Sequence, residues 1–213
     1  LFVVNRWLMR LLFRLRVEGG GRLPPAGAFV ITPNHVSDLD PMVVAAALPL
    51  SRLRRLHWAG DAVRLFSNRA SRLFCRVVHL FPVDEKHPAA AVSAAAQVLG
   101  MGHALVWFPE GWRSPDGRPM RFQPGIGQLL LRARVPAVPA FIVGTFEALP
   151  RTRRVPRLVP VRLIFGEPVD ASTLLAEVAE GEPEERIAAA LRARVLRLGR
   201  EAGAILDDAP PPA

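Results

Sequence analysis

The sequence predicts an α/β fold, with a single layered domain and a mixed, largely parallel β-sheet flanked by helices. Short apolar runs that suit buried strands alternate with stretches of helical periodicity through the middle of the chain. Such alternation is typical of layered α/β domains. The length of 213 residues fits one domain, and a hydrophobic fraction of 50% is enough for a sizeable core.

Residues 1–18 are expected to form a basic amphipathic helix. Arg6, Arg10 and Arg14 recur at four-residue spacing, and they would form one stripe among apolar residues that include Trp7. The pattern fits a helix in a membrane interface, and it equally fits a helix packed on the domain with solvated arginines. No uncharged apolar run of about 18 residues is present, so we expect peripheral attachment at the cytoplasmic face and no spanning helix.

The main domain is expected over residues 19–206, and its elements follow in chain order. A glycine- and proline-rich loop leads into a strand at 28–31, and Pro41 begins a helix that continues over 42–50. Residues 207–213 are expected to be a disordered proline-rich tail. Further strands are predicted at 56–59, 79–83, 104–108, 138–143 and 161–165, and further helices at 62–78, 88–99, 125–134 and 184–206.

The net charge of +9 comes almost entirely from arginine and suits an anionic partner, such as a phosphorylated substrate, a membrane surface or nucleic acid. No nucleic-acid-binding motif is recognisable, so no nucleic acid is expected as a partner. The one cysteine, Cys75, excludes an internal disulfide, and a core position for it is more common than a nucleophilic role. The chain begins without methionine, which is compatible with a piece of a longer protein.

The stretch Asn34-His35-Val36-Ser37-Asp38-Leu39-Asp40 is the candidate catalytic segment. It lies between a predicted strand and the Pro41 helix, where α/β folds place reactive groups. Asp40 is close enough in sequence to accept a hydrogen bond from one nitrogen of His35, which would leave the other nitrogen as a base. From the spacing alone, a loop histidine beside a helix-capping acid explains the pair equally well.

A second candidate stretch, Phe108-Pro109-Glu110-Gly111-Trp112-Arg113-Ser114, follows another predicted strand. Gly111 allows the backbone to approach a ligand closely, and Arg113 can hold a phosphate through paired N–H donors. Glu110 can bind a hydroxyl or position the loop. Taken alone, the stretch is also explained by an ordinary turn with a surface Glu–Arg pair.

Together the two stretches resemble the signatures of the PlsC-type glycerolipid acyltransferases, the lysophosphatidate acyltransferase family. The family has an Asn-His-x-Ser-x-x-Asp block followed by Phe-Pro-Glu-Gly-x-Arg-Ser, and residues 122–125 and 135–140 match two further family features. The resemblance covers roughly residues 17–170 and implies a glycerol-3-phosphate acyltransferase-like fold. It implies that His35 and Asp40 are catalytic. The expected substrate-binding residues are Asn34, Ser37, Lys86, Glu110, Gly111, Arg113, Ser114 and Pro139.

One departure from the family concerns the block between the two signatures. Glu85 stands where the family usually has an arginine that is implicated in seating the acceptor's phosphate, and Lys86 is the nearest cation. An acceptor other than 1-acylglycerol-3-phosphate, either another lysophospholipid or a glycolipid, therefore stays open. Trp112 also replaces the more common threonine and offers a flat apolar surface beside the site.

The resemblance implies transfer of a fatty acyl group from an acyl-CoA or acyl-ACP thioester to a lysophospholipid hydroxyl. His35 would be the general base, Asp40 would orient it, and no acyl-enzyme, metal or resident cofactor is expected. Backbone N–H groups at the start of the Pro41 helix are candidate oxyanion donors. Candidate walls for an acyl groove are Trp58, Phe66, Phe74, Trp107 and Trp112.

Two other classes of function stay open. In a thioesterase or lysophospholipid hydrolase, water would replace the acceptor, although the chain has no Gly-x-Ser-x-Gly stretch of the serine hydrolases. A non-enzymatic basic module that docks on a membrane is the second alternative. The acyltransferase remains our preferred interpretation, because both signatures occur in the family's order.

Overall fold

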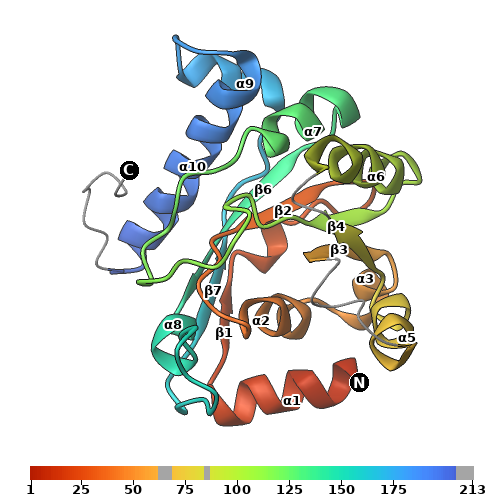
Figure 1. Cartoon of the computed structure of the whole chain (residues 1–213). Helices are drawn as coiled ribbons and strands as arrows, with labels where there is room; N and C mark the ends of the chain where they lie inside the picture. Colours follow the sequence, from red (N-terminus) through yellow and green to blue (C-terminus); the bar gives the residue numbers. More distant parts are fainter. Residues whose placement is uncertain (62–68, 84–86, 205–213) are drawn as a thin grey trace.

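One mixed sheet of seven strands forms the centre of the structure (Figure 1). This computed structural model describes residues 1–61, 69–83 and 87–204. The strands are β1 (Arg16–Glu18), β2 (Val30–Pro33), β3 (Leu56–Asp61), β4 (Leu80–Val83), β5 (Ala104–Val106), β6 (Ala137–Val143) and β7 (Arg162–Phe165). Their order in the sheet is β1-β7-β6-β2-β5-β3-β4. Neighbouring strands are parallel except for β6 and β7, which are antiparallel.

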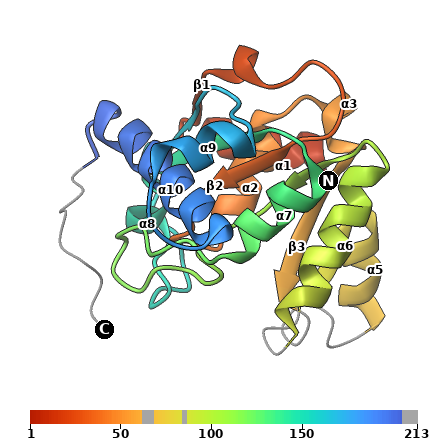
Figure 2. The ribbon, with the colours of Figure 1, turned by 90° about the horizontal axis from the view of Figure 1, so that it is seen from above.

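Helices cover both faces of this sheet (Figure 1, Figure 2). They are α1 (Phe2–Leu12), α2 (Asp40–Ala47), α3 (Leu50–Leu53), α5 (Arg69–Val77), α6 (Pro88–Gly100), α7 (Gly125–Ala133), α8 (Thr145–Ala148), α9 (Ala171–Glu177) and α10 (Pro183–Glu201). A short 3-10 helix, η1, spans Gly20–Arg22. One apolar cluster joins α1 and α2 to the sheet, and a second joins α6, α7, α9 and α10 to it. The predicted α/β class with a mixed, largely parallel sheet is confirmed.

The central strands consist almost entirely of buried apolar residues. β2 and β6 are buried along nearly their whole length, as expected for strands that are covered by helices on both faces. Continuous apolar runs therefore predicted these strands close to their observed positions. β1 was missed because its three residues are all exposed at the edge of the sheet and contain no apolar run.

Several boundaries differ from the sequence prediction. The strand expected over 104–108 ends at Val106, since Phe108 and Pro109 already belong to the loop of the second motif. The short helices α3, α8 and α9 were not predicted. The helix expected over 62–78 is seen only as α5, because residues 62–68 lie outside the described residues, as does the tail 207–213. Cys75 is buried in α5, and burial raises the pKa of its thiol, which fits a core residue.

The N-terminal helix is shorter than the predicted 1–18. α1 ends at Leu12, and the residues from 16 to 18 form β1 instead. Arg14 has a positive φ of 48° beyond the end of the helix, so the predicted stripe of three arginines is wrong. The helix packs on α2, with Met9 buried and Asn5 Nδ2 donating to the Met42 carbonyl at 2.8 Å.

The outward side of α1 is mainly apolar. Arg6 donates to the Leu48 carbonyl rather than pointing into solvent, while Arg10 is exposed. The large apolar residues that α1 and its N-cap expose are Leu1, Val3, Val4, Trp7, Leu8, Leu11 and Leu12. The packing of α1 on the domain is confirmed, but apolar residues rather than an arginine face make up most of its exposed side. Among the helices described here, none combines the length and apolar character that crossing a bilayer requires.

A glycine sets the distance between α7 and α10. A Cβ atom added to Gly127 would lie 2.1 Å from the Glu184 carbonyl oxygen and 2.5 Å from its Cα. Because backbone atoms cannot move aside as a flexible side chain can, any larger residue at this position must push the two helices apart. The contact fixes the first turn of α10 against the first turn of α7.

We expect Gly127→Ala to lower the free energy of unfolding by about 1–3 kcal/mol, because overpacking displaces backbone rather than a side chain. Urea unfolding followed by far-UV circular dichroism measures the change. The matched control is Gly125→Ala on the same helix, where an added Cβ would meet only the Val92 and Trp107 side chains at 3.7 and 3.9 Å. Equal stability of the two variants would contradict the close contact.

Candidate active site

The two motifs follow neighbouring parallel strands. β2 pairs with β5, with Val30 opposite Leu105, and residues 34–40 and 107–114 leave these strands at the same edge of the sheet. The carboxyl ends of parallel strands are where α/β folds commonly build their sites. The backbone N–H of Ser114 donates to the His35 carbonyl at 2.8 Å, so the two loops are in direct contact.

The predicted dyad is present. His35 Nδ1 lies 2.9 Å from Asp40 Oδ2, and Asp40 is fully buried at the first residue of α2. A carboxylate accepts hydrogen bonds, so the proton belongs on Nδ1 and the lone pair on Nε2. Within the described residues, His35 Nε2 has no hydrogen-bond partner, and the side chain is 17% exposed. The geometry therefore leaves one basic nitrogen open to a substrate.

Asp40 Oδ2 also closes the loop that carries His35. It accepts the backbone N–H groups of Val36 at 2.7 Å and Ser37 at 2.8 Å. The N–H of Leu39 donates to the Ser37 hydroxyl, and the N–H of Asp40 to the Ser37 carbonyl. These four N–H groups are thus engaged within the loop, and the oxyanion donors expected at the start of the Pro41 helix stay a prediction.

Phe108 packs against the face of the His35 imidazole. Its ring is stacked on that of His35, with 4.0 Å between centroids and 24° between planes. Phe108 belongs to the second motif, so both signatures together fix the ring plane. Stacking and the bond to Asp40 restrict the two side-chain torsions of His35.

The Glu110 side chain is buried and accepts hydrogen bonds from backbone N–H groups. It is 3% exposed, and its two oxygens accept the N–H groups of His35 and Met120, each at 2.8 Å. Burial raises the pKa of Glu110 to about 8, although both N–H bonds oppose the shift by favouring the ionised form. Of the two roles considered for this residue, the contacts match positioning of the loop.

Three other predicted substrate-binding residues also make internal contacts. Asn34 exchanges two hydrogen bonds with the Ile142 backbone, at 2.7 and 3.2 Å, and so extends the β2–β6 ladder past the end of β2. The Ser37 hydroxyl donates to the Leu149 carbonyl at 2.7 Å, and that of Ser114 to Asp116 at 2.9 Å. All three are buried and hold the loops in place.

Three more predicted residues, Gly111, Pro139 and Lys86, differ in where they lie. Gly111 has a φ of 78°, which favours glycine, and lies exposed in the loop. Pro139 is buried in β6 opposite Thr32, away from solvent. Lys86 lies outside the described residues, and so do Glu85 and Phe66.

The cationic side of the site is formed by two arginines. Arg113 Nη1 lies 2.6 Å from Asp38 Oδ2, and its side chain is 12% exposed. Arg151, which the motifs did not indicate, donates to the Arg113 carbonyl at 3.1 Å and lies over the Trp112 ring at 5.7 Å. The only sequence signal for Arg151 was the basic run in which it stands, and that run was more simply explained as solvated surface.

The candidate walls of an acyl groove do not converge. Trp58 is buried in the first apolar cluster, and Trp107 packs against the second. Phe74 and Trp112 are exposed on separate elements, α5 and the second-motif loop. Of the candidate walls among the described residues, only Trp112 is both exposed and next to Arg113.

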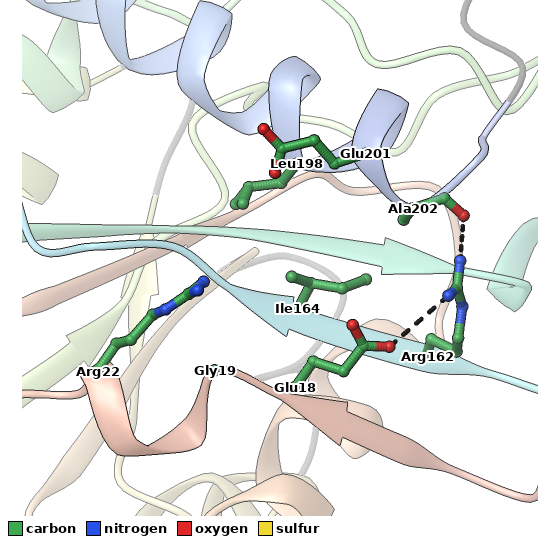
Figure 3. A pocket seen from close by; sticks show the side chains of 8 residues that line it. All are labelled: Glu18, Gly19, Arg22, Arg162, Ile164, Leu198, Glu201 and Ala202. Carbon is green, nitrogen blue, oxygen red and sulfur yellow. Dashed lines mark hydrogen bonds and ion pairs between the residues drawn. The ribbon is translucent and has the colours of Figure 1, made fainter.

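A cavity of about 180 Å³ lies apart from the dyad, between the β1–β7 edge of the sheet and the end of α10 (Figure 3). Its lining residues are Glu18, Gly19, Arg22, Arg162, Ile164, Leu198, Glu201 and Ala202. Arg162 lies 3.6 Å from Glu18 and donates to the Ala202 carbonyl, so its charge is used internally. None of the predicted site residues lines this cavity.

Three histidines cluster at the opposite end of the strands. His57 Nε2 lies 2.9 Å from His103 Nδ1, and its ring stacks on those of His79 and His103 at 5.0 Å. Burial first, and then the charges of the other two, lower the pKa of His57 to about 4, so it is neutral at pH 7. Within the described residues, no group of three His, Cys, Asp or Glu is arranged to hold a metal ion.

Comparison with known proteins connects this geometry to a family. Residues 14–143, which include both motifs, match the family model described as Acyltransferase. The human 1-acyl-sn-glycerol-3-phosphate acyltransferase alpha is 33% identical over 141 residues, which cover 62% of this chain and 47% of that protein. The mouse protein of the same name is 31% identical over 154 residues, covering 64% and 51%. This chain thus spans about half the length of these relatives.

Two further matches extend over more of the chain. The 1-acyl-sn-glycerol-3-phosphate acyltransferase of Bacillus subtilis (strain 168) is 26% identical over 189 residues, covering 86% of this chain and 87% of that protein. The crystal structure of the 1-acyl-sn-glycerophosphate (LPA) acyltransferase PlsC from Thermotoga maritima matches with a TM-score of 0.75. It is 22% identical, covers 97% of this chain and 81% of that chain, and shows the shared fold.

The family match covers more than half of the chain, and it contains the His35–Asp40 pair and the loop that supports it. The chain therefore belongs to the acyltransferase family, and it is of the PlsC type that its two motifs predicted.

Proposed function

We propose that this chain is an O-acyltransferase that moves a fatty acyl group from a thioester to a hydroxyl of a lysophospholipid. The acceptor is 1-acyl-sn-glycerol-3-phosphate, the compound in the names of the human, mouse and B. subtilis relatives. The donor is acyl-CoA or an acyl-ACP thioester, and no metal or resident cofactor takes part. The observation that carries the proposal is the 2.9 Å contact between His35 Nδ1 and Asp40 Oδ2, which leaves Nε2 as a base.

In the proposed step, His35 Nε2 accepts the proton of the acceptor hydroxyl while that oxygen attacks the thioester carbonyl carbon. Asp40 holds Nδ1–H and stabilises the imidazolium that forms. When the tetrahedral intermediate collapses, the carbon–sulfur bond breaks and the leaving thiolate takes the proton from Nε2–H. The products are an ester and a free thiol, and His35 returns to its neutral form. Such base assistance contributes about 10²–10⁴-fold in rate.

Direct transfer, without an acyl-enzyme, is supported by the state of the nearest hydroxyl group. Ser37 is fully buried, and its Oγ donates to the Leu149 carbonyl while accepting the Leu39 N–H. A serine nucleophile needs its proton on a base and its oxygen exposed to the substrate. Ser37 satisfies neither condition, because its donor and one of its acceptor positions serve the backbone.

We place the anionic headgroup of the acceptor at Arg113 and Arg151. Arg151 is exposed, yet its contacts with the Arg113 carbonyl and the Trp112 ring hold it beside the dyad loops. No acidic residue occurs between Glu147 and Glu167, so the positive charge of this segment is not offset within it. A guanidinium fork suits a phosphate, and Arg151 supplies the cation that Glu85 does not.

We further propose that the protein attaches peripherally to the cytoplasmic face of a membrane through α1. The inner side of α1 is packed on α2, while its outward side exposes Val4, Leu8 and Leu11 together with Trp7. A packed helix with an apolar outer side can enter the headgroup region without unfolding. Attachment there would bring the lipid acceptor and the fatty acyl donor to the same surface.

His35→Ala should reduce acyl transfer by about 10²–10⁴-fold, because the hydroxyl loses its base. The assay follows radiolabelled acyl-CoA with and without 1-acyl-sn-glycerol-3-phosphate. His103→Ala, at the far end of the strands, is the control and should keep its activity. Release of free fatty acid at the same rate without acceptor would identify a hydrolase, and full activity of His35→Ala would refute the proposed base.

Arg151→Ala should raise the KM for 1-acyl-sn-glycerol-3-phosphate by about 10–100-fold, as expected when one hydrogen bond to a charged group is lost. The kcat and the KM for the donor should stay close to their original values. Transfer to an uncharged monoacylglycerol should be unaffected. Arg154→Ala, in the same exposed loop, is the matched control. An equal KM increase for the charged and uncharged acceptors would exclude a headgroup contact.

Leu11→Glu should weaken binding to vesicles of phosphatidylglycerol by about 10-fold or more, because Leu11 is 71% exposed and would enter the lipid. Vesicle co-sedimentation measures the change. The control is Met101→Glu, which also replaces an exposed apolar residue with glutamate. Met101 is 62% exposed and follows the end of α6, a helix that lies away from α1 (Figure 1). Equal loss in both variants would show that α1 is not the attachment site.

A further inference from the structure

An arginine on the C-terminal helix holds the loop that carries the second motif. The chain between β5 and α7 passes alongside α10 (Figure 1). Arg192, half-buried on α10, donates from Nε to the Met120 carbonyl at 2.8 Å and from Nη2 to the Pro119 carbonyl at 3.0 Å. Because the guanidinium is planar and rigid, two consecutive carbonyl groups are fixed by one side chain.

The contacts continue from this loop to the catalytic histidine. The N–H of Met120 donates to Glu110 Oε2 at 2.8 Å, and Glu110 Oε1 accepts the N–H of His35, also at 2.8 Å. Glu110 is 3% exposed, so neither of its oxygens can exchange these partners for bulk water. A connected series of hydrogen bonds thus runs from α10 to the backbone of His35.

The charge of Arg192 acts on the same carboxylate. Burial raises the pKa of Glu110, the negative charge of Asp40 raises it further, and the positive charge of Arg192 lowers it. The ionised carboxylate is the better acceptor for two N–H groups, since a protonated one carries a donor on one oxygen. Arg192 therefore favours the form of Glu110 that holds both loops.

We propose that Arg192 is a positioning residue for acyl transfer, acting through the Pro119–Met120 backbone and Glu110 on the placement of His35. Arg192 lies outside residues 14–143, which the family model matches, and its two hydrogen bonds described above reach the Pro119–Met120 backbone, beyond the second motif. The inference depends on the proposed acyltransferase function for its kinetic consequences, but not for its structural ones.

The chain contains a close structural match for a control. Arg186 is also half-buried on α10, and it donates from Nε to the Val178 carbonyl at 2.6 Å and from Nη2 to the Leu175 carbonyl at 2.5 Å. These carbonyls belong to α9 and the residue that ends it, away from Glu110. If Arg192 only attached α10 to its surroundings, the two arginines would have the same effect.

In the kinetic experiment, Arg192→Ala should lower kcat by about 10–100-fold while each KM changes less than about twofold. The substitution misplaces His35 but does not weaken substrate binding. The pH of half-maximal activity should move upward, since Glu110 without its cation stays protonated to higher pH. Arg192→Lys should restore the pH profile by keeping the charge, with only part of kcat. Arg186→Ala should change neither quantity.

A second measurement does not require activity. Hydrogen exchange of the His35 and Met120 amides, followed by NMR, should be faster in Arg192→Ala and unchanged in Arg186→Ala. If Arg192→Ala does not fold, Arg192→Gln, which keeps donors without charge, should show the upward pH shift. Unchanged exchange and pH profile in a folded variant would overturn the positioning role. If exchange is faster in Arg192→Ala but the unsubstituted protein shows no acyl transfer, the proposed function is refuted and the positioning role is not.

Discussion

The site depends on one carboxylate oxygen. Asp40 Oδ2 accepts from the His35 imidazole and from two backbone N–H groups, and the whole side chain is buried. An opened loop would leave this buried acceptor unsatisfied, which costs about 1–3 kcal/mol or more for a charged group. The loop conformation, the imidazole tautomer and the direction of Nε2 are consequently determined together.

The sheet order brings a second set of supports to the same place. Because β2 lies between β5 and β6, the His35 loop is held on one side by Glu110 and on the other by the Asn34–Ile142 contacts. The buried polar residues of the two signatures thus make contacts that hold the His35 imidazole and the loops around it. This distribution agrees with the general rule that catalytic groups need a rigid second layer of contacts.

The sequence predicted those features that depend on local spacing or continuous burial. The His35–Asp40 pair could be predicted because both residues belong to one strand-to-helix turn, and the central strands because they are apolar throughout. The partners of Glu110 and Asn34 could not be predicted, since they lie 75 and 108 residues away. β1 and the end of α1 at Leu12 could not be predicted either, because exposed residues at a sheet edge carry no periodic signal.

The antiparallel pairing of β7 with β6 separates the protein into two portions, one that carries both motifs and one that follows β6. The family match ends at Val143, where β6 ends, and the antiparallel return keeps residues 144–161 at the catalytic edge before the chain continues to α10. This later portion supplies Arg151 and Arg192 without altering the dyad. Under the function proposed above, changes in the length or charge of this later portion would alter the acceptor preference and leave the His35–Asp40 pair unchanged.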